Sequence, residues 1–135
     1  IKPTPGREYQ TGAAVAIDAR HLCADMQPLP LLSSFSEVAL EAARQTEPTL
    51  PRAHLFDRLP SDWLARLERL DCVALDVNHR ELTPEVIAQA HDAGFRVLCY
   101  TANDPERVQL LLRWGVDSVI TDAVDLLDPD TSLPR

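Results

Sequence analysis

Residues 97–121, VLCYTANDPERVQLLLRWGVDSVIT, decide the fold class of this chain. They begin with Val97-Leu98-Cys99-Tyr100-Thr101, a nearly continuous apolar run that is typical of a strand buried on both faces. Asp104-Pro105-Glu106 has the composition of a helix start, and Gly115 is expected to end that helix. A short apolar run, 118–121, follows. This order predicts two parallel strands joined by a helical crossover.

The same alternation extends toward the N-terminus. Residues 73–77 predict a further strand, residues 29–35 contain another that starts after Pro30, and residues 54–56 predict a weaker one. Helices are expected between these strands. They are marked by residues 12–24, by Ser36 as an N-cap, by Ser61 as an N-cap, and by Thr83 as an N-cap with Gly94 as the stop. The chain therefore reads as a strand and a helix repeated about four times.

Two architectures fit such alternation. One is an open, doubly wound α/β sheet, and the other is a TIM-type (β/α)8 barrel, which normally needs about 250 residues. At 135 residues the chain holds about half of a barrel's units. Its first residues, Ile1-Lys2-Pro3, read as the end of a strand already under way, so we expect the N-terminus to be a cut. The polar, proline-containing residues 128–135 are expected to form a frayed C-terminal tail.

Composition argues against several classes of function. The formal net charge is −8 and the isoelectric point is near 4.8, whereas nucleic-acid binding depends on clustered Lys and Arg. No apolar run approaches the roughly 20 residues of a membrane span. Cys23, Cys72 and Cys99 are far apart and show no CxxC spacing. We therefore expect reduced thiols, two of them buried, rather than a zinc site or a redox pair.

Four motifs lie in order along the chain: Ile1-Lys2-Pro3, then LLSSFS at 31–36, VLCYTAN at 97–103 and WGVDSVITD at 114–122. Together they resemble the C-terminal half of the glycerophosphodiester phosphodiesterase family. In that family the first motif is a strand ending Glu-x-Lys, and its glutamate would lie before this chain. The third motif usually ends Trp-Thr-x-Asn, so Tyr100 replaces a tryptophan. The resemblance covers almost the whole sequence.

A fifth stretch, Val77-Asn78-His79, is similar to the bacterial cytoplasmic branch of the family. The resemblance selects the TIM-type barrel, in the architecture of the phospholipase-C-like (PLC-like) phosphodiesterases, over the doubly wound sheet. It implies that residues 1–127 are the C-terminal part of that barrel. It also implies that the parent protein is cytoplasmic and acts on a small molecule, with neither a membrane nor a nucleic acid as partner.

The reaction implied by the resemblance is metal-dependent hydrolysis of a glycerophosphodiester to an alcohol and glycerol 3-phosphate. In the family, three carboxylates hold a divalent ion, Mg²⁺ or Ca²⁺, and histidines act as general acid and base. Those carboxylates and histidines have no counterpart in this sequence. We therefore assign no metal ligand here and expect the isolated chain to be inactive.

Five residues at predicted strand ends are candidates for the site. The Lys2 ammonium would offset the charge of a phosphodiester and its transition state, although a surface lysine has the same pattern. Phe35 and Tyr100 could pack against the glycerol or the leaving alcohol, or fill the barrel core. Ser34 could bind substrate or cap a helix, and Asn103 could donate to substrate or belong to a turn. These four residues are the substrate-binding candidates, although a helix cap is the favoured role for Ser34 and a turn for Asn103.

Other polar residues receive structural interpretations. Asp76 and His79 suggest a metal pair, but their spacing puts them on opposite faces of a strand. We therefore expect them in a strand-end network whose hydrogen bonds are satisfied. Asp117 and Asp122 bracket a short strand and are expected to serve turns and caps.

Two rival readings remain open. A half-barrel exposes two strand edges, so the chain could be a non-catalytic module that forms a homo-oligomer or binds phosphate. A small doubly wound phosphate-binding domain is weaker, because neither GxGxxG nor GxxxxGK[ST] occurs.

Overall fold

The structure of the chain is a computed structural model that describes residues 1–127, so the tail predicted at 128–135 lies outside the described residues. Within that region the elements follow one another as α1 (Glu8–Leu22), β1 (Leu32–Ser34), α2 (Glu37–Thr46), β2 (Arg52–Phe56), α3 (Trp63–Arg69), β3 (Ala74–Asn78), α4 (Pro84–Asp92), β4 (Arg96–Tyr100), α5 (Pro105–Trp114) and β5 (Ser118–Val119). All the predicted strands are present, including the weak one at 54–56.

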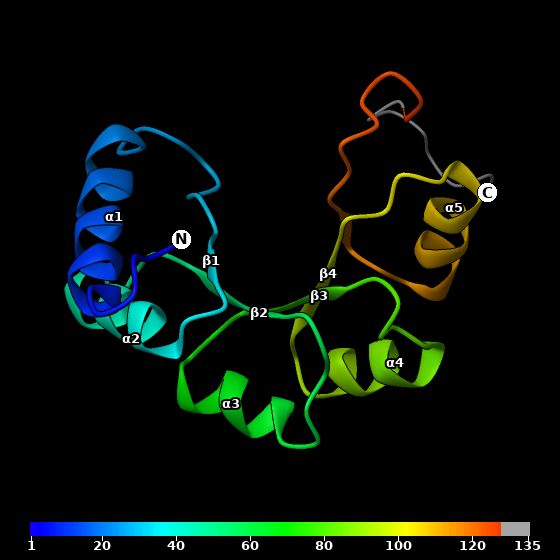
Figure 1. Cartoon of the computed structure of the whole chain (residues 1–135), viewed down its shortest axis with the longest axis horizontal. Helices are drawn as coiled ribbons and strands as arrows, with labels where there is room; N and C mark the ends of the chain where they lie inside the picture. Colours follow the sequence, from blue (N-terminus) through cyan, green and yellow to red (C-terminus); the bar gives the residue numbers. More distant parts are fainter. Residues whose placement is uncertain (128–135) are drawn as a thin grey trace.

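The strands form one parallel sheet in the order β1-β2-β3-β4-β5. Each strand pairs with the next one along the chain, and α2 to α5 make the crossovers. A doubly wound sheet reverses its strand order and carries helices on both faces, whereas here the order never reverses. The sheet curves, and the helices lie on its convex side (Figure 1). This is the arrangement of an arc of a barrel.

Side chains alternate between the two faces of the sheet, as they must in strands. Leu75 and Val77 of β3 are buried in the core that the helices cover. Asp76 therefore points to the opposite, concave face, where its register partners are Leu55 of β2 and Leu98 of β4. The hydrophobic core lies on the convex face, under the helices. The concave face is the side on which a ligand or a further layer of the protein can lie.

Most of the predicted helix starts are confirmed by cap geometry. The Ser36 side chain accepts a hydrogen bond from the amide of Ala39, and the Thr83 side chain accepts one from Val86. The prediction that Ser61 caps a helix is wrong, because α3 has Asp62 at its N-cap and no side-chain cap bond. Asp62 instead accepts from the Arg66 guanidinium at 3.0 Å, one turn further on.

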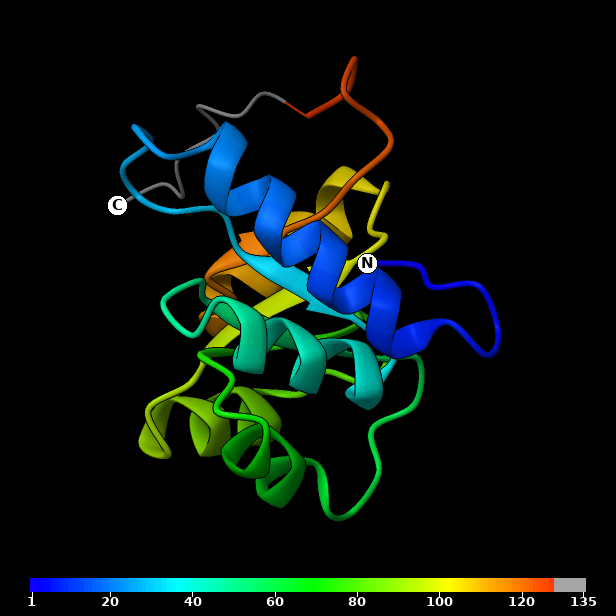
Figure 2. The ribbon, with the colours of Figure 1, turned by 90° about the vertical axis from the view of Figure 1, so that its left-hand side faces the viewer.

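Helix α1 packs against α2, as Figure 2 shows. Its start, Glu8, precedes the predicted residue 12, and Gly12 lies inside it. A Cβ atom on Gly12 would lie 2.2 Å from the carbonyl oxygen of Ala39, so only glycine allows the two backbones this approach. Helix α5 ends as predicted, since Gly115 takes a left-handed conformation with φ of 103°.

The N-terminal residues lie alongside β1 without being a strand of the sheet. The Ile1 ammonium donates to the carbonyl oxygen of Ser33, and the Ser34 hydroxyl donates to the carbonyl oxygen of Ile1 at 2.9 Å. Residues 1–3 thus lie beside β1, where the end of a strand was predicted, but they do not form a regular strand.

Burial agrees with the expectation for the cysteines. Cys72 and Cys99 are buried, Cys23 is half-buried, and the three thiols are free. Burial raises the pKa of Cys72 and of Cys99 to about 12, so both stay protonated. Among the described residues, no helix has the length and apolar character that crossing a membrane requires.

Candidate functional site

The carboxyl ends of parallel strands meet at one edge of the sheet, which is where barrel enzymes place their sites. In this chain that edge carries polar and aromatic side chains from four consecutive strands. We call it the rim, and its residues are Phe35, Asp57, Asn78, Tyr100 and Asn103.

The most informative contact on the rim joins Phe35 and Tyr100. Their rings meet edge to face with centroids 5.9 Å apart. Phe35 follows β1 and Tyr100 ends β4, so the contact crosses the concave face in front of β2 and β3. Phe35 is 51% exposed, which leaves its ring available for contact with a ligand. The pair forms an apolar surface of the kind that packs against the carbon atoms of a small substrate.

The Tyr100 hydroxyl has a fixed position. It donates a hydrogen bond of 2.8 Å to the main-chain carbonyl of Phe56. Burial, followed by the negative charges of Asp57 and Asp76, raises the pKa of Tyr100 to about 12. The phenol is therefore neutral at physiological pH, and its proton is already engaged.

Asp57 and Asn78 are rim residues that sequence reasoning missed. The Asn78 amide donates to an Asp57 carboxylate oxygen at 3.2 Å, and its own carbonyl accepts from the backbone of Arg80. Both residues end or follow a predicted strand, so their place in a parallel sheet was a usable signal. Their charged and polar groups make the rim polar next to the aromatic pair.

Lys2 lies next to the carboxyl end of β1, because the main chain at Ile1 is hydrogen-bonded to Ser33 and Ser34. The Ile1 side chain packs against the apolar cluster of Ala16 and Leu32 on the helix side. The Lys2 side chain is exposed. Its predicted contact with a phosphate stays a prediction.

Ser34 is fully buried, and its hydroxyl already makes two hydrogen bonds. It donates to the Ile1 carbonyl and accepts from the amide of Ser36 at 3.1 Å. This geometry fastens the N-terminal residues to β1. It also shows that Ser34 is not the helix cap, a role that Ser36 takes. Substrate binding by Ser34 remains a prediction, and the structure gives it a supporting place behind the rim.

Asn103 connects two loops. Its side-chain oxygen accepts from the Thr121 hydroxyl at 2.9 Å and from the Asp122 amide at 2.8 Å. The residue therefore holds the loop after β5 against the loop after β4. The side-chain NH2 group of Asn103 is the part that a ligand could use. The contact of Asn103 with substrate is still a prediction.

Asp117 has a structural role, but it joins separate elements and is not the turn or cap residue that was expected. Its carboxylate accepts from the Val97 amide at 2.8 Å and from Arg96 and His91 at 2.9 Å each. These contacts lie at the amino end of β4, opposite the rim. Burial opposes the effect, but the bonds from Val97, His91 and Arg96 lower the pKa of Asp117.

The prediction of a satisfied network at Asp76 and His79 is wrong for Asp76. Asp76 is 1% exposed, and its Oδ1 atom has no hydrogen-bond partner within residues 1–127. Burial raises its pKa to about 6. His79 is held instead by Arg107, which donates to its Nδ1 atom at 3.3 Å and to its carbonyl. Arg107 also lies over the ring of Trp114, 4.9 Å from its centroid.

The donor set of the described chain does not suit a complete divalent metal site. Within residues 1–127, no three side chains of His, Cys, Asp or Glu gather where they could hold an ion. The rim has one exposed carboxylate, Asp57, whose neighbour Asn78 already donates to it. Hard divalent cations need several oxygen ligands, so the chemistry open to this chain is positioning and charge compensation.

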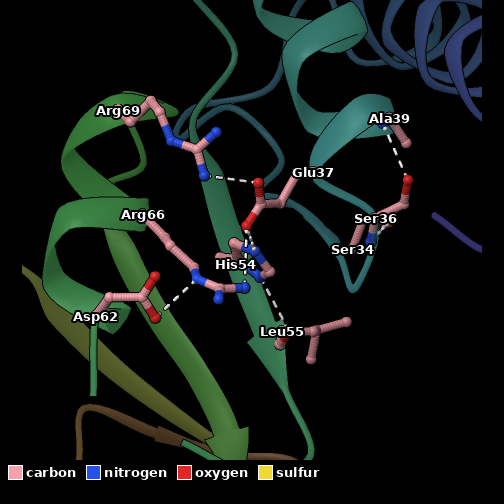
Figure 3. A network of polar contacts seen from close by, with 9 residues as sticks. All are labelled: Ser34, Ser36, Glu37, Ala39, His54, Leu55, Asp62, Arg66 and Arg69. Atoms are coloured by element: carbon pink, nitrogen blue, oxygen red, sulfur yellow. Dashed lines mark hydrogen bonds and ion pairs between the residues drawn. The ribbon is translucent and has the colours of Figure 1, made fainter. Parts of the chain in front are cut away.

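A second polar cluster lies away from the rim, on the helix side of the sheet (Figure 3). Glu37 of α2 accepts from Arg69 at 2.6 Å and from Arg66 at 3.3 Å, and it lies 3.4 Å from the Nε2 atom of His54. His54 is 3% exposed and stacks on Phe56. Burial lowers the pKa of His54 more than Glu37 raises it. The cluster joins α2, β2 and α3 and faces away from the concave surface.

Residues 10–126 match the glycerophosphoryl diester phosphodiesterase family. The chain belongs to this family. The match covers both ends of the rim and includes four of the five candidate residues, with Lys2 just outside it. Family membership assigns the curved parallel sheet to the TIM-type barrel of these enzymes, so the predicted fold is confirmed.

Similar proteins of this family have been characterised or solved. The chain is 29% identical over 100 residues to a glycerophosphodiester phosphodiesterase of Bacillus subtilis, which covers 71% of this chain and 34% of that protein. A phosphodiesterase of Oleispira antarctica, solved in complex with its product sn-glycerol-3-phosphate, is 33% identical with a TM-score of 0.79 over 90% of this chain and 49% of that one. A glycerophosphoryl diester phosphodiesterase from Silicibacter pomeroyi is 28% identical with a TM-score of 0.77 over 90% of this chain and 44% of that one. The chain therefore spans about half the length of its family relatives of known structure.

Proposed function

We propose that this chain forms part of a phosphodiesterase that hydrolyses glycerophosphodiesters to an alcohol and glycerol 3-phosphate. One observation carries the proposal: in a chain of this family, the Phe35 and Tyr100 rings meet across the concave face, at the end of the sheet where Lys2 lies. Substrates of barrel enzymes bind at that end.

The residues of this chain would bind and orient the substrate. The aromatic pair supplies an apolar wall for the glycerol carbons or the leaving alcohol. The Lys2 ammonium offsets the charge of the phosphodiester, which grows as the attacking oxygen adds to phosphorus. Asn103 and the buried Ser34 hold the loops and the N-terminal residues that present these groups.

The parent enzyme would use a divalent metal, Mg²⁺ or Ca²⁺, which supplies Lewis-acid chemistry at the phosphoryl group. Its ligands would come from parts of the barrel other than this chain. For this reason we expect the 135-residue chain by itself to be inactive. The buried free thiols Cys72 and Cys99 suit a reducing compartment, and we place the reaction in the cytoplasm.

The test compares the whole protein that carries this chain with its Lys2→Ala and Lys2→Arg variants. Release of glycerol 3-phosphate from a glycerophosphodiester is followed with an enzymatic assay. Loss of a preorganised cation is expected to lower kcat/KM on the order of a hundredfold, with partial recovery in Lys2→Arg. Arg7→Ala removes an exposed cation near the N-terminus and serves as the matched control. Unchanged kcat/KM in Lys2→Ala would contradict the role given to Lys2, and absence of any hydrolysis by the whole protein would contradict the function.

The alternative is a non-catalytic half-barrel that assembles with itself or binds phosphate. The open concave face of the described region supports this alternative (Figure 1). Size-exclusion chromatography with light scattering separates the two. A stable dimer of the 135-residue chain that binds phosphate without hydrolysing any diester would support the alternative.

A further inference from the structure

Asp76 is a buried acid for which the described chain provides no partner. It is 1% exposed, its Oδ1 atom is unpaired within residues 1–127, and its neighbours in register are Leu55 and Leu98. Buried carboxyl groups in folded proteins are almost always hydrogen-bonded, because an unpaired one costs several kcal/mol. An exception on this scale needs an explanation.

Three side chains of the neighbouring elements that carry donors, Tyr100, Asn78 and Arg107, bond other partners. The Tyr100 hydroxyl donates to the Phe56 carbonyl, and the Asn78 amide donates to Asp57. Arg107 is bound to His79. Its charge and that of Asp76 both affect the pKa of Cys99, in opposite directions. None of these three side chains donates a hydrogen bond to Asp76 within the described region.

Asp76 points into the concave face, which in a closed barrel is the interior. Barrel interiors are filled by layers of side chains from strands on opposite sides, so a residue of β3 meets residues from across the barrel. The relatives are about twice as long as this chain, and the five strands here leave three for the remainder of an eight-stranded barrel. A second copy of this chain would instead bring the total to ten strands.

We propose that Asp76 accepts a hydrogen bond across the barrel from a cationic or amide side chain on the strands that complete it. The occupant of the concave face is therefore the complementary half of the barrel, and the Asp76 contact is the polar point at which the two halves are aligned. A single buried polar pair among apolar side chains restricts how two surfaces can pack, because a misaligned packing leaves the polar group unpaired.

The experiment uses the whole protein that carries this chain, in the variants Asp76→Asn, Asp76→Leu and, as the control, Asp18→Leu at an exposed position of α1. Urea unfolding gives the ratio of folded to unfolded protein. Breaking a buried pair by removing one member is expected to lower this ratio on the order of a hundredfold to a thousandfold in Asp76→Leu. Asp76→Asn keeps one acceptor oxygen and is expected to lose less, and Asp18→Leu is expected to change little.

A second measurement covers the case in which Asp76→Leu fails to fold. Carbon-13 NMR of the aspartate carboxyls follows the titration of Asp76 in the wild-type whole protein. A donor across the barrel lowers the pKa of Asp76 below the value measured in the same way in the 135-residue chain, whereas a merely space-filling residue buries the carboxyl group further and raises its pKa.

The proposal is wrong if Asp76→Leu is as stable as the wild type, or if the pKa of Asp76 in the whole protein is equal to or above the pKa measured in the 135-residue chain. It is also wrong if the intact protein has a mass of 15.0 kDa with no companion polypeptide, or if Asp76 holds two copies of this chain together. None of these readouts measures hydrolysis. The Asp76 proposal can therefore be wrong while the proposed phosphodiesterase activity is right, and the activity can be absent while the Asp76 proposal is right.

Discussion

The hydroxyl of Tyr100 on β4 donates a 2.8 Å hydrogen bond to the main-chain carbonyl of Phe56 on β2, reaching past the intervening strand β3. The bond fixes the ring that meets Phe35. It links strands that do not pair directly, so it supports the curvature of the sheet at the rim.

Tyr100→Phe keeps the aromatic contact and removes only this hydrogen bond. We expect the chain to lose about 1 kcal/mol of stability, the usual net value of one such bond. Urea unfolding of the 135-residue chain measures it, with Tyr9→Phe as the control, because the Tyr9 hydroxyl bonds Gln45 on the exposed surface. Equal losses in the two variants would mean that the Phe56 contact has no special role.

Glu37 is expected to stabilise the chain at neutral pH and to lose that effect in acid. Burial opposes ionisation, but hydrogen bonds from Arg69 and His54 lower the pKa of Glu37 below its ordinary value of 4.5. A lowered folded-state pKa gives stability above pH 4.5 that is lost as the pH falls through the folded value. Glu37→Gln should cost about 1 kcal/mol at pH 7 and progressively less as the pH falls below 4.5, measured by urea unfolding over a series of pH values. A cost that does not change with pH would contradict the ionic explanation.

Asp76 should have the opposite pH dependence in the isolated chain. Burial raises its folded-state pKa to about 6, so its contribution to stability is greatest below the ordinary pKa of 3.8 and falls as the pH rises through 6. The loss should approach roughly 3 kcal/mol, from a shift of about two pKa units. Asp76→Asn removes the ionisation and should be more stable than the wild type at pH 7 but not at pH 4. Asp18→Asn, at an exposed site, should leave the curve unchanged.

Gly12→Ala should separate α1 from α2. The added Cβ would meet the Ala39 carbonyl oxygen at 2.2 Å, which neither backbone can relieve without moving. Overpacking of this kind costs about 1–3 kcal/mol. Thermal unfolding measures the effect, and Ala14→Ser on the exposed side of the same helix is the control. A Gly12→Ala chain as stable as its control would show that the helices slide apart freely.

Much of the fold was predictable from local pattern. The strand at 97–101, the caps at Ser36 and Thr83, and the stop at Gly115 are each signalled within a few residues, because capping and burial are local effects. The Ser61 prediction failed because the helix begins one residue later than expected, with Asp62 at its N-cap and no side-chain cap bond.

The site was less predictable than the fold. Tyr100 and Phe35 were found through family motifs, whereas Asp57 was missed because it belongs to no such motif. Asn78 lies in the stretch Val77-Asn78-His79, but its contact with Asp57 depends on the pairing of two strands. The roles of Ser34 and Asn103 as braces for distant segments depend on contacts with Ile1 and Thr121, which lie far away along the chain.

The amino-acid sequence by itself determined the alternation of strands and helices, the start and end of most helices and the family, because these depend on hydrophobic period, capping residues and motif order. Only the tertiary structure decided that the sheet curves, that Phe35 meets Tyr100 across it, and that Asp76 is buried with no partner among residues 1–127. Those facts depend on which residues come together from distant strands, and neither the spacing of residues along a strand nor their composition specifies that.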